Sequence, residues 1–294
     1  MTSPGLIKQI IRERAIQRRE RERKQLPLTD DNEDFCETIR SKLDGLLDSN
    51  QFWNFVRCGN EQQFRTCKQC RKVETYTYRC CIRWCPRCQW HIVKMRQRVI
   101  QLWAQKIAQP KHLVLTQKNF PVLTRRRIRE HTHALARFRR SSIFRNVRGG
   151  CVSTEITNEG NGWHLHSHWL VDADWLDIKN ISIRWGKIVG QNFAIVKVRD
   201  CRDRDYVQEV AKYVVEGSEL ASWPAEQINE FVCAIRGLRF FFSFGTLAAL
   251  APQIRAEINA QKPPPPICEC GCSEFIYESE DDALAWEAMH DKRR

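Results

Sequence analysis

Polar and apolar residues alternate along two neighbouring segments in the middle of the chain. Residues 162–171 place Leu165, Trp169 and Val171 at odd positions, with histidines at even positions between them. This period of two is typical of a β-strand, whose successive side chains point to opposite faces of a sheet. Residues 151–157 have a strand-like pattern as well. The short polar connection at residues 158–162 therefore predicts that the two strands form a hairpin.

The remaining pattern predicts helices and further strands on both sides of this hairpin. Over residues 89–108, apolar residues recur at spacings of three and four, which is typical of an amphipathic helix. Further helices are expected at residues 35–57, 123–138, 177–189, 205–216 and 224–236. Strand-like segments lie at residues 112–116, 193–198 and 238–244.

Three histidines share one face of the predicted strand at residues 162–171, namely His164, His166 and His168. A lone histidine in a strand usually has no special role, but three in alternation form a row of imidazoles that can bind a metal ion. In the hairpin, Glu155 of the preceding strand can face this row and add a carboxylate. Imidazole and carboxylate ligands together suit Mn²⁺ or Mg²⁺ better than a structural zinc.

Cysteines are concentrated at residues 58–90. Two Cys-x-x-Cys pairs, Cys67–Cys70 and Cys85–Cys88, predict one tetrahedral Zn²⁺ site with four thiolate ligands and a structural role. The segment between the pairs is slightly shorter than in the usual zinc pattern. Three other cysteines of this block either offer alternative ligands or bind a second zinc: Cys58, Cys80 and Cys81. Near the C-terminus, three cysteines can bind a metal, but no fourth ligand is obvious: Cys268, Cys270 and Cys272.

The chain is strongly basic, with 48 Lys and Arg against 35 Asp and Glu and a net charge of +13. Such a charge favours a polyanionic partner, above all nucleic acid, although a solvated basic surface would have the same composition. The densest basic patch lies in the predicted helix at residues 123–138. It supplies the residues expected to contact DNA phosphates, because arginine binds phosphate in a bidentate manner: Arg125, Arg126, Arg127 and Arg129.

Charged residues, not an apolar stretch, follow the first residues of the chain, so we expect no targeting segment. The apolar run at residues 240–251 is too short to span a bilayer, and no membrane partner is expected. Paired cysteines without a signal peptide indicate metal binding in a reducing cytoplasm.

Four regions are expected along the chain. Residues 1–57 form a charged helical arm, and residues 58–90 form the zinc-binding cysteine module. Residues 91–250 form the main domain. Residues 251–294 contain a proline-rich linker and a tail that combines cysteines with acidic residues.

The predicted helix at residues 205–216 carries Tyr206, Glu209 and Tyr213 on one face, because these residues are three and four positions apart. Lys212 lies one residue away from this face. On its own, the pattern fits either core packing with a solvent-exposed edge or a set of catalytic residues.

Together, these stretches resemble the replication initiators of rolling-circle plasmids, which belong to the HUH endonuclease superfamily. The resemblance spans residues 58–245. It rests on the His166-Ser-His168 strand, Glu155, the Glu209-Val-Ala-Lys212-Tyr213 segment, Gly162-Trp-His164 and the cysteines from Cys80 to Cys88. There are two departures: Ser167 replaces the usual hydrophobic residue, and Leu165 stands where this branch often has proline. Neither removes a metal ligand.

The resemblance implies an α+β fold with a central antiparallel sheet flanked by helices, and with the cysteine module preceding or inserted into it. It implies cleavage of one DNA strand by Tyr213, which leaves a 5′-phosphotyrosine and a 3′-OH primer. Glu209 would then activate water, Lys212 would complete the catalytic set, and Tyr206 is a less favoured second nucleophile. The partners would be origin DNA, single-stranded or in a hairpin, and a host helicase. Two alternatives stay open: an HUH-type transposase and a zinc-containing DNA-binding regulator without catalysis.

Overall fold

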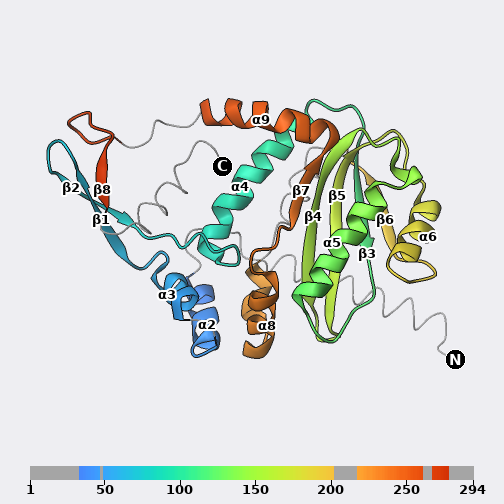
Figure 1. The fold of residues 1–294 in the computed structure, drawn as a ribbon, viewed down its shortest axis with the longest axis horizontal. Helices are drawn as coiled ribbons and strands as arrows, with labels where there is room; N and C mark the ends of the chain where they lie inside the picture. Colours follow the sequence, from blue (N-terminus) through green and yellow to red (C-terminus); the bar gives the residue numbers. More distant parts are fainter. Residues whose placement is uncertain (1–32, 47–48, 202–216, 261–266, 278–294) are drawn as a thin grey trace.

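The computed structural model describes residues 33–46, 49–201, 217–260 and 267–277, which form an α+β protein with two antiparallel sheets. The strand order of the larger sheet is β6-β3-β5-β4-β7, and that of the smaller is β2-β1-β8 (Figure 1). The larger sheet consists of β3 (Pro110–Thr116), β4 (Gly149–Asn158), β5 (Trp163–Asp172), β6 (Val196–Asp200) and β7 (Phe241–Phe244). The smaller consists of β1 (Gln62–Cys67), β2 (Val73–Thr77) and β8 (Phe275–Tyr277).

The helices flank these sheets. They are α2 (Glu33–Leu43), α3 (Ser49–Arg57), α4 (Pro86–Ala104), α5 (Arg125–Arg139), α6 (Ile178–Ile188), α8 (Ala225–Ile235) and α9 (Gly245–Ala260). Short 3₁₀ turns are η1 (Ser142–Phe144) and η2 (Gly217–Ser222). The expected class, an antiparallel sheet flanked by helices, is therefore confirmed. No helix in the described part of the chain is long and apolar enough to cross a membrane.

The predicted hairpin is the centre of the larger sheet. Strands β4 and β5 pair antiparallel along their whole length, from Gly149 opposite Asp172 to Asn158 opposite Trp163. The turn between them contains two glycines with positive φ, and a Cβ at Gly162 would lie 2.8 Å from the carbonyl oxygen of Phe120. Only glycine fits this close approach without strain.

Different helices cover the two faces of the larger sheet. Helices α5 and α6 bury one face, where Phe138 of α5 packs against both Trp169 of β5 and Trp185 of α6. Helices α4 and α9 cover part of the other face, where Trp103 and Ile254 belong to one buried cluster with Leu170. Figure 1 shows these two pairs of helices on opposite sides of the sheet. Since His164, His166 and His168 alternate with Trp169 and its neighbours, the histidines lie on the face of α4 and α9, called the histidine face below.

The smaller sheet lies at the opposite end of the molecule from β6 (Figure 1). Its three strands contribute no residue to the three buried hydrophobic clusters of the described chain. Its stability therefore needs another source, because a sheet without a hydrophobic core is marginal in water.

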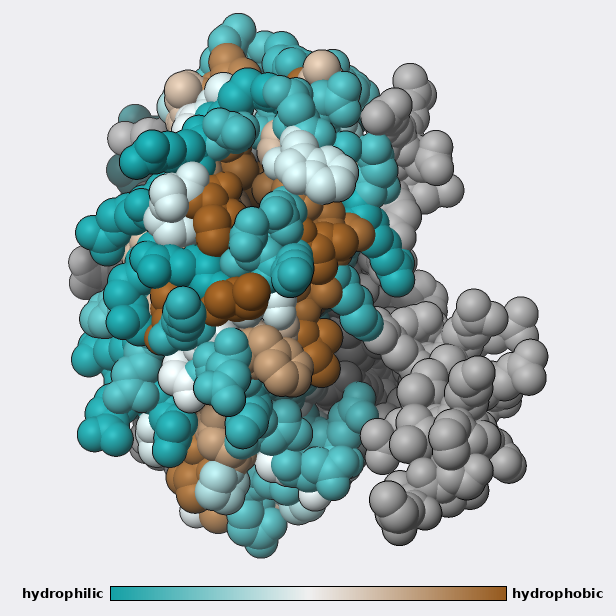
Figure 2. Space-filling model, turned by 90° about the vertical axis from the view of Figure 1, so that its right-hand side faces the viewer, coloured by the Kyte–Doolittle hydropathy of each residue, from teal (hydrophilic) through white to brown (hydrophobic). Residues whose placement is uncertain are grey.

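Exposed apolar side chains lie around α6 and the edge strand β6, among many hydrophilic residues (Figure 2). The largest exposed fractions belong to Trp175, Phe193 and Ile195, at 77%, 70% and 65%. Helix α6 packs on the face of the larger sheet opposite the histidines, so most of this surface is separate from the histidine face.

Helix α9, the β1–β2 hairpin and β8 were not anticipated from the sequence. The predicted strand at residues 238–244 contains β7. Helix α9 follows it directly and reaches residue 260, within the region expected to be linker and tail. The β1–β2 hairpin lies in the cysteine module, where no strand was predicted. Helix α4 begins at Pro86, a favoured first helical residue, so the expected boundary at residues 90 and 91 falls inside this helix.

Candidate functional site

The β4–β5 pairing places a carboxylate and two imidazoles together on the histidine face. Glu155 lies directly opposite His166, and His168 follows two residues later on the same side of β5. Ligand atoms of these three residues all lie within 4.8 Å of one another. Nε2 of His168 lies 2.8 Å from Oε2 of Glu155, and Nε2 of His166 hydrogen-bonds the same oxygen. The three side chains thus converge on one point.

This group has the chemistry of a divalent cation site. Burial raises the pKa of Glu155, but the charges and hydrogen bonds of His166 and His168 outweigh it and hold the pKa well below its usual range. The carboxylate is therefore ionised. Nδ1 of His166 is buried without a hydrogen-bond partner in the described structure, so this ring is not committed to an alternative structural network. Two imidazole nitrogens and a carboxylate oxygen can together bind a divalent metal ion.

The structure does not bring His164 into the group, although its side chain shares the face. The centres of the His164 and His166 rings are 4.9 Å apart. Burial, and then the charge of His166, lowers the pKa of His164 to about 4. His164 is thus a neutral imidazole beside the Glu155, His166 and His168 group.

His112 on β3 is a neighbour of this group that the sequence did not reveal. Its Nε2 lies 3.2 Å from Nδ1 of His168, and the two rings are stacked at an interplanar angle of 17°. Burial, and then the charge of His168, lowers the pKa of His112 to about 3, so His112 is neutral and can accept a proton donated by His168. In this tautomer Nε2 of His168, which faces Glu155, carries the lone pair that can bind a metal ion. The sequence held no signal for this contact, since His112 stands alone in its segment.

Ser167, a departure from the family pattern, belongs to the opposite face of the sheet. It is fully buried, and its Oγ lies 2.8 Å from Nε2 of His131 on α5. Burial lowers the pKa of His131 to about 3, so this histidine is neutral as well. The buried serine therefore has a hydrogen-bond partner and does not take part in the Glu155 group.

The two predicted Cys-x-x-Cys pairs do not share one site, which corrects the expected ligand set. Cys85 and Cys88 lie with two cysteines that the sequence left unassigned, Cys58 and Cys80. In this group the Sγ–Sγ distance is 3.4 Å between Cys58 and Cys88, and 3.7 Å for Cys80–Cys88 and Cys58–Cys85. These four residues are called the first cysteine group.

Cys67 and Cys70 instead lie with Cys268 and Cys270 of the C-terminal segment, and these four are called the second cysteine group. The reason for the separation is the β1–β2 hairpin. Cys58 and Cys80 flank its open end, whereas Cys67 and Cys70 lie at its turn. A strand of six residues spans about 20 Å, too far for one ion to bind cysteines at both ends.

The predicted DNA-binding arginines lie at the start of α5, which packs on the face opposite the histidines. Arg126 forms an ion pair with Glu130 at 3.4 Å, and the Arg127 guanidinium lies over the Phe120 ring at 5.2 Å. Arg125 donates a hydrogen bond to the carbonyl oxygen of Arg236, and Arg129 is exposed. Phe120 pairs with Trp163, so these arginines lie at the end of the sheet where β5 begins.

A second set of arginines surrounds Arg96, which lies on the histidine face itself. Arg96 of α4 is over the ring of Phe241, whose strand position is opposite Ser153 and therefore beside His168 in the sheet. Burial, and then the charges of Arg83 and Arg255, lowers the pKa of Arg96 to about 10. Since like charges repel, this cluster favours an anion. The sequence did not single it out, because its members are far apart along the chain.

The candidate nucleophiles lie outside the described residues. Tyr206, Glu209, Lys212 and Tyr213 all belong to residues 202–216. The last described residue before them is Cys201, which packs in one buried cluster with Cys151 and Leu170. The described chain therefore reaches this segment from the histidine face.

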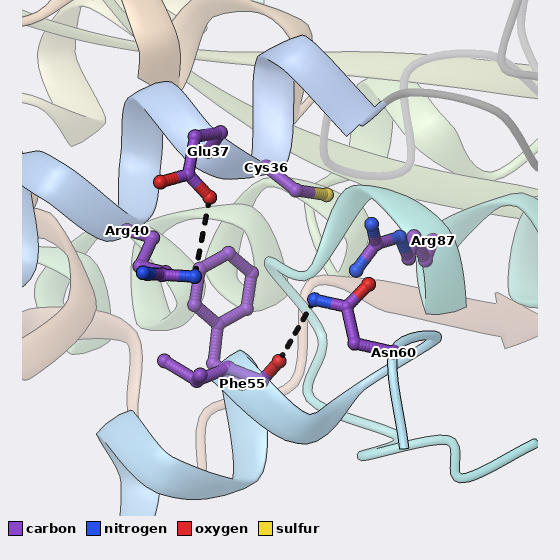
Figure 3. Close-up of a pocket in the computed structure, with 7 residues that line it drawn as sticks. Cys36, Glu37, Arg40, Phe55, Asn60 and Arg87 are labelled. Carbon is purple, nitrogen blue, oxygen red and sulfur yellow. Dashed lines mark hydrogen bonds and ion pairs between the residues drawn. The ribbon is translucent and has the colours of Figure 1, made fainter. Parts of the chain in front are cut away.

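A cavity of about 260 Å³ lies elsewhere, between α2, α3 and the start of α4 (Figure 3). Cys36, Phe55 and Arg87 line it, together with the Glu37–Arg40 ion pair. Burial raises the pKa of the Cys36 thiol to about 11, so this cysteine is neutral. None of the residues of the Glu155 group lines this cavity.

Fold and site together define an α+β protein with a histidine and carboxylate group on a central antiparallel hairpin. A comparison with protein families matches residues 71–262 to the family described as replication protein. This match covers more than half of the 294 residues, and the chain belongs to this replication protein family. The match supports the resemblance to rolling-circle plasmid replication initiators. The searches of curated proteins and of solved structures returned no match.

Proposed function

We propose that this replication protein starts rolling-circle replication by cutting one strand of origin DNA with an HUH-type site. The observation that carries the proposal is the position of Glu155 opposite His166 and beside His168, in a chain of the replication protein family. Glu155, His166 and His168 would hold Mn²⁺ or Mg²⁺, and His164 lies next to them. A bound ion of this kind polarises the scissile phosphate.

In the proposed reaction, the hydroxyl oxygen of Tyr213 forms a bond to the phosphorus while the bond to the 3′ oxygen breaks. The tyrosine loses its proton and the departing oxygen gains one, so the products are a 5′-phosphotyrosine and a 3′-OH primer. A free tyrosine has a pKa of about 10, so at neutral pH it needs an electrophilic phosphate. Glu209, one helical turn from Tyr213 in the predicted helix, would later activate water.

The proposed DNA path follows the two arginine sets. Arg83, Arg96 and Arg255 would neutralise phosphates on the histidine face, and the arginines at the start of α5 would contact DNA beyond the end of β5. Such phosphate contacts position a strand without reading its sequence. A single strand or hairpin suits this path because the cut requires one strand at the Glu155 group. A host helicase would supply strand separation.

We further propose that the first cysteine group binds structural Zn²⁺. A four-cysteine site leaves no coordination position open, so its role is to stabilise the fold. It would join the end of α3 to the start of α4, because Cys58 follows α3 and Cys85 precedes Pro86.

Cleavage of single-stranded origin oligonucleotides tests the function, followed by mass spectrometry for a tyrosine adduct. The wild-type protein should cut only with Mn²⁺ or Mg²⁺ and should carry the adduct on Tyr213. His166→Ala with His168→Ala should abolish cleavage and leave DNA binding nearly unchanged, because phosphate contacts supply most of the affinity. His133→Ala is the matched control, since His133 is exposed on α5. Cleavage by the double variant would refute the site, whereas DNA binding without cleavage by the wild type would indicate a regulator.

A further inference from the structure

Four cysteines from distant parts of the chain meet at the smaller sheet. Cys67 and Cys70 lie at the β1–β2 turn, and Cys268 and Cys270 precede β8. The Sγ–Sγ distance is 3.6 Å between Cys67 and Cys270 and 3.3 Å between Cys70 and Cys268, although 203 and 198 residues separate these partners. All four sulfurs lie within 4.8 Å of one another.

This arrangement matches a tetrahedral zinc site. With a Zn–S bond of about 2.3 Å, tetrahedral geometry puts neighbouring sulfurs about 3.8 Å apart. A disulfide would need about 2.05 Å, well below the observed distances. We propose that the second cysteine group binds a structural Zn²⁺ that fastens the C-terminal segment to the β1–β2 hairpin. This ion is additional to the one proposed for the first cysteine group.

Both halves of the site have the tight turns that let neighbouring cysteines bind one ion. In the first half, the backbone N–H of Arg71 donates to the carbonyl oxygen of Cys67 at 3.1 Å, and Arg71 has a φ of 61°. In the second half, the N–H of Gly271 donates to the carbonyl oxygen of Cys268 at 2.7 Å, and Gly271 has a φ of 84°. The left-handed residue after each pair turns the chain back, so both sulfurs face the same side.

The C-terminal segment makes few other contacts with the β1–β2 hairpin. Strand β8 pairs with β1 over three residues, Arg65 lies over the Phe275 ring at 3.8 Å, and the rings of Tyr76 and Tyr277 are 6.3 Å apart, but neither β1 nor β8 belongs to a buried hydrophobic cluster. Two ion pairs connect the halves, Lys68–Glu274 at 3.2 Å and Lys72–Glu269 at 2.5 Å, but all four side chains are largely exposed. Exposed ion pairs contribute at most about 1 kcal/mol each. A metal ion supplies the missing stabilisation.

The charges around the group favour the anionic complex that Zn²⁺ forms with four thiolates. Four thiolates and Zn²⁺ carry a net charge of about −2, and the thiol protons are released to solvent when the ion binds. Lys68, Arg71 and Lys72 lie in or next to the β1–β2 turn and partly balance that charge.

Zinc analysis of the full-length protein tests the proposal. The wild-type protein should retain about two zinc ions per chain after dialysis, one for each cysteine group. The double variant Cys268→Ser with Cys270→Ser should retain about half as much zinc. Its backbone amides in β1 around Thr66 should also exchange hydrogen faster than in the wild type. Cys272→Ser should change neither result, because Cys272 lies in the same turn but outside the group. Full zinc content in the double variant would overturn the proposal.

A measurement on the wild-type protein does not depend on the folding of any variant. Cys70, Cys270, Cys81 and Cys233 are all exposed, but only the first two belong to the group. In zinc-loaded protein, an alkylating reagent should label Cys81 and Cys233 and spare Cys70 and Cys270 until a chelator removes the ion. Equal labelling of all four before chelation would refute the zinc site. This outcome does not depend on DNA cleavage.

Discussion

Buried neutral histidines support the candidate metal centre from both faces of the central hairpin. His112 contacts His168 on the histidine face, and His131 contacts Ser167 on the opposite face. Both have a pKa of about 3, mainly because burial disfavours the charged ring. Each therefore acts as a hydrogen-bond partner for a residue of β5 and not as a cation.

Replacing His112 with Phe keeps a ring in the buried space but removes the acceptor for Nδ1 of His168. The loss of such a partner typically weakens metal affinity about 10–100-fold. Calorimetric titration of Mn²⁺ should show this loss, and cleavage should recover at high Mn²⁺ concentration. His133→Phe should leave Mn²⁺ affinity unchanged. An unaltered affinity in the His112 variant would show that its contact with His168 does not support the ligand.

The stability of the fold should fall in acid because of His131. Its pKa is about 3 when folded and near the usual 6.5 when unfolded, so the unfolded chain binds the extra proton below pH 6.5. Stability due to this residue is therefore fully present above about pH 6.5 and falls by about 1.4 kcal/mol for each pH unit below it. Urea unfolding of His131→Leu and wild type at pH 6.5 and 5.5 should show a smaller pH slope in the variant. Equal slopes would mean that His131 is protonated in the folded protein. His133→Leu is the control and should keep the pH slope of the wild type.

At the scale of elements, α4 contributes to both the core and the proposed DNA path. Ile100 and Trp103 are buried against the sheet, whereas Arg96 lies over Phe241 at the β7 edge. The helix thus places a cation on the histidine face through the same packing that stabilises the larger sheet.

Arg96→Ala should weaken binding of single-stranded DNA, because it removes a phosphate contact near the Glu155 group. The slope of log affinity against log salt concentration should fall by about 0.7, the value for one phosphate of a single strand. Fluorescence anisotropy over a range of salt concentrations measures this slope. Arg98→Ala, at an exposed position of the same helix, is the comparison variant. An unchanged slope for Arg96→Ala would show that Arg96 does not contact a DNA phosphate.

The predicted helix at residues 205–216 supports a separate test of catalytic roles. Tyr213→Phe removes only the hydroxyl, so it should abolish both cleavage and adduct. Glu209→Ala should still form the adduct but should release it about 10²–10⁴-fold more slowly, as expected when a general base is lost. Time courses of adduct on denaturing gels distinguish the two. An adduct in Tyr213→Phe would identify Tyr206 as the nucleophile, and no cleavage by Glu209→Ala would exclude a role limited to hydrolysis.

At the scale of the whole molecule, the two cysteine groups connect distant segments in different surroundings. The first joins α3 to α4 inside a buried cluster that contains Cys58, Cys85 and Cys88 together with Trp84. The second joins the smaller sheet to the C-terminal segment, outside any such cluster. Loss of the first group should therefore destabilise the main body of the protein, and loss of the second should affect the smaller sheet.

Cys80→Ser should lose one zinc ion and lower the free energy of unfolding by more than about 4 kcal/mol, a magnitude typical of a lost structural metal. Thermal unfolding and zinc analysis together measure the effect. The neighbouring Cys81→Ser should change neither quantity, since Cys81 lies outside both groups. If both variants were equally stable and retained their zinc, the first cysteine group would not be a structural zinc site.

The β4–β5 hairpin was predictable from the chain alone. Alternation with a period of two and a short glycine-containing connection indicate which residues share a face, so Glu155 was expected to face the histidine row, whereas the exact register appears only in the structure. The helices α4, α5, α6 and α8 were predictable for the same reason, because burial of one face leaves a periodic pattern in the chain.

Which distant residues meet depends on how the separate elements pack together. Local spacing suggested that Cys67, Cys70, Cys85 and Cys88 form one site, but the length of the β1 strand separates the two pairs. Each pair then finds partners that no spacing rule connects to it, as in the contact between Cys70 and Cys268. The positions of His112 and Arg96 were hidden for the same physical reason. Periodicity records which side of an element is buried, whereas the packing of separate elements determines what that side contacts.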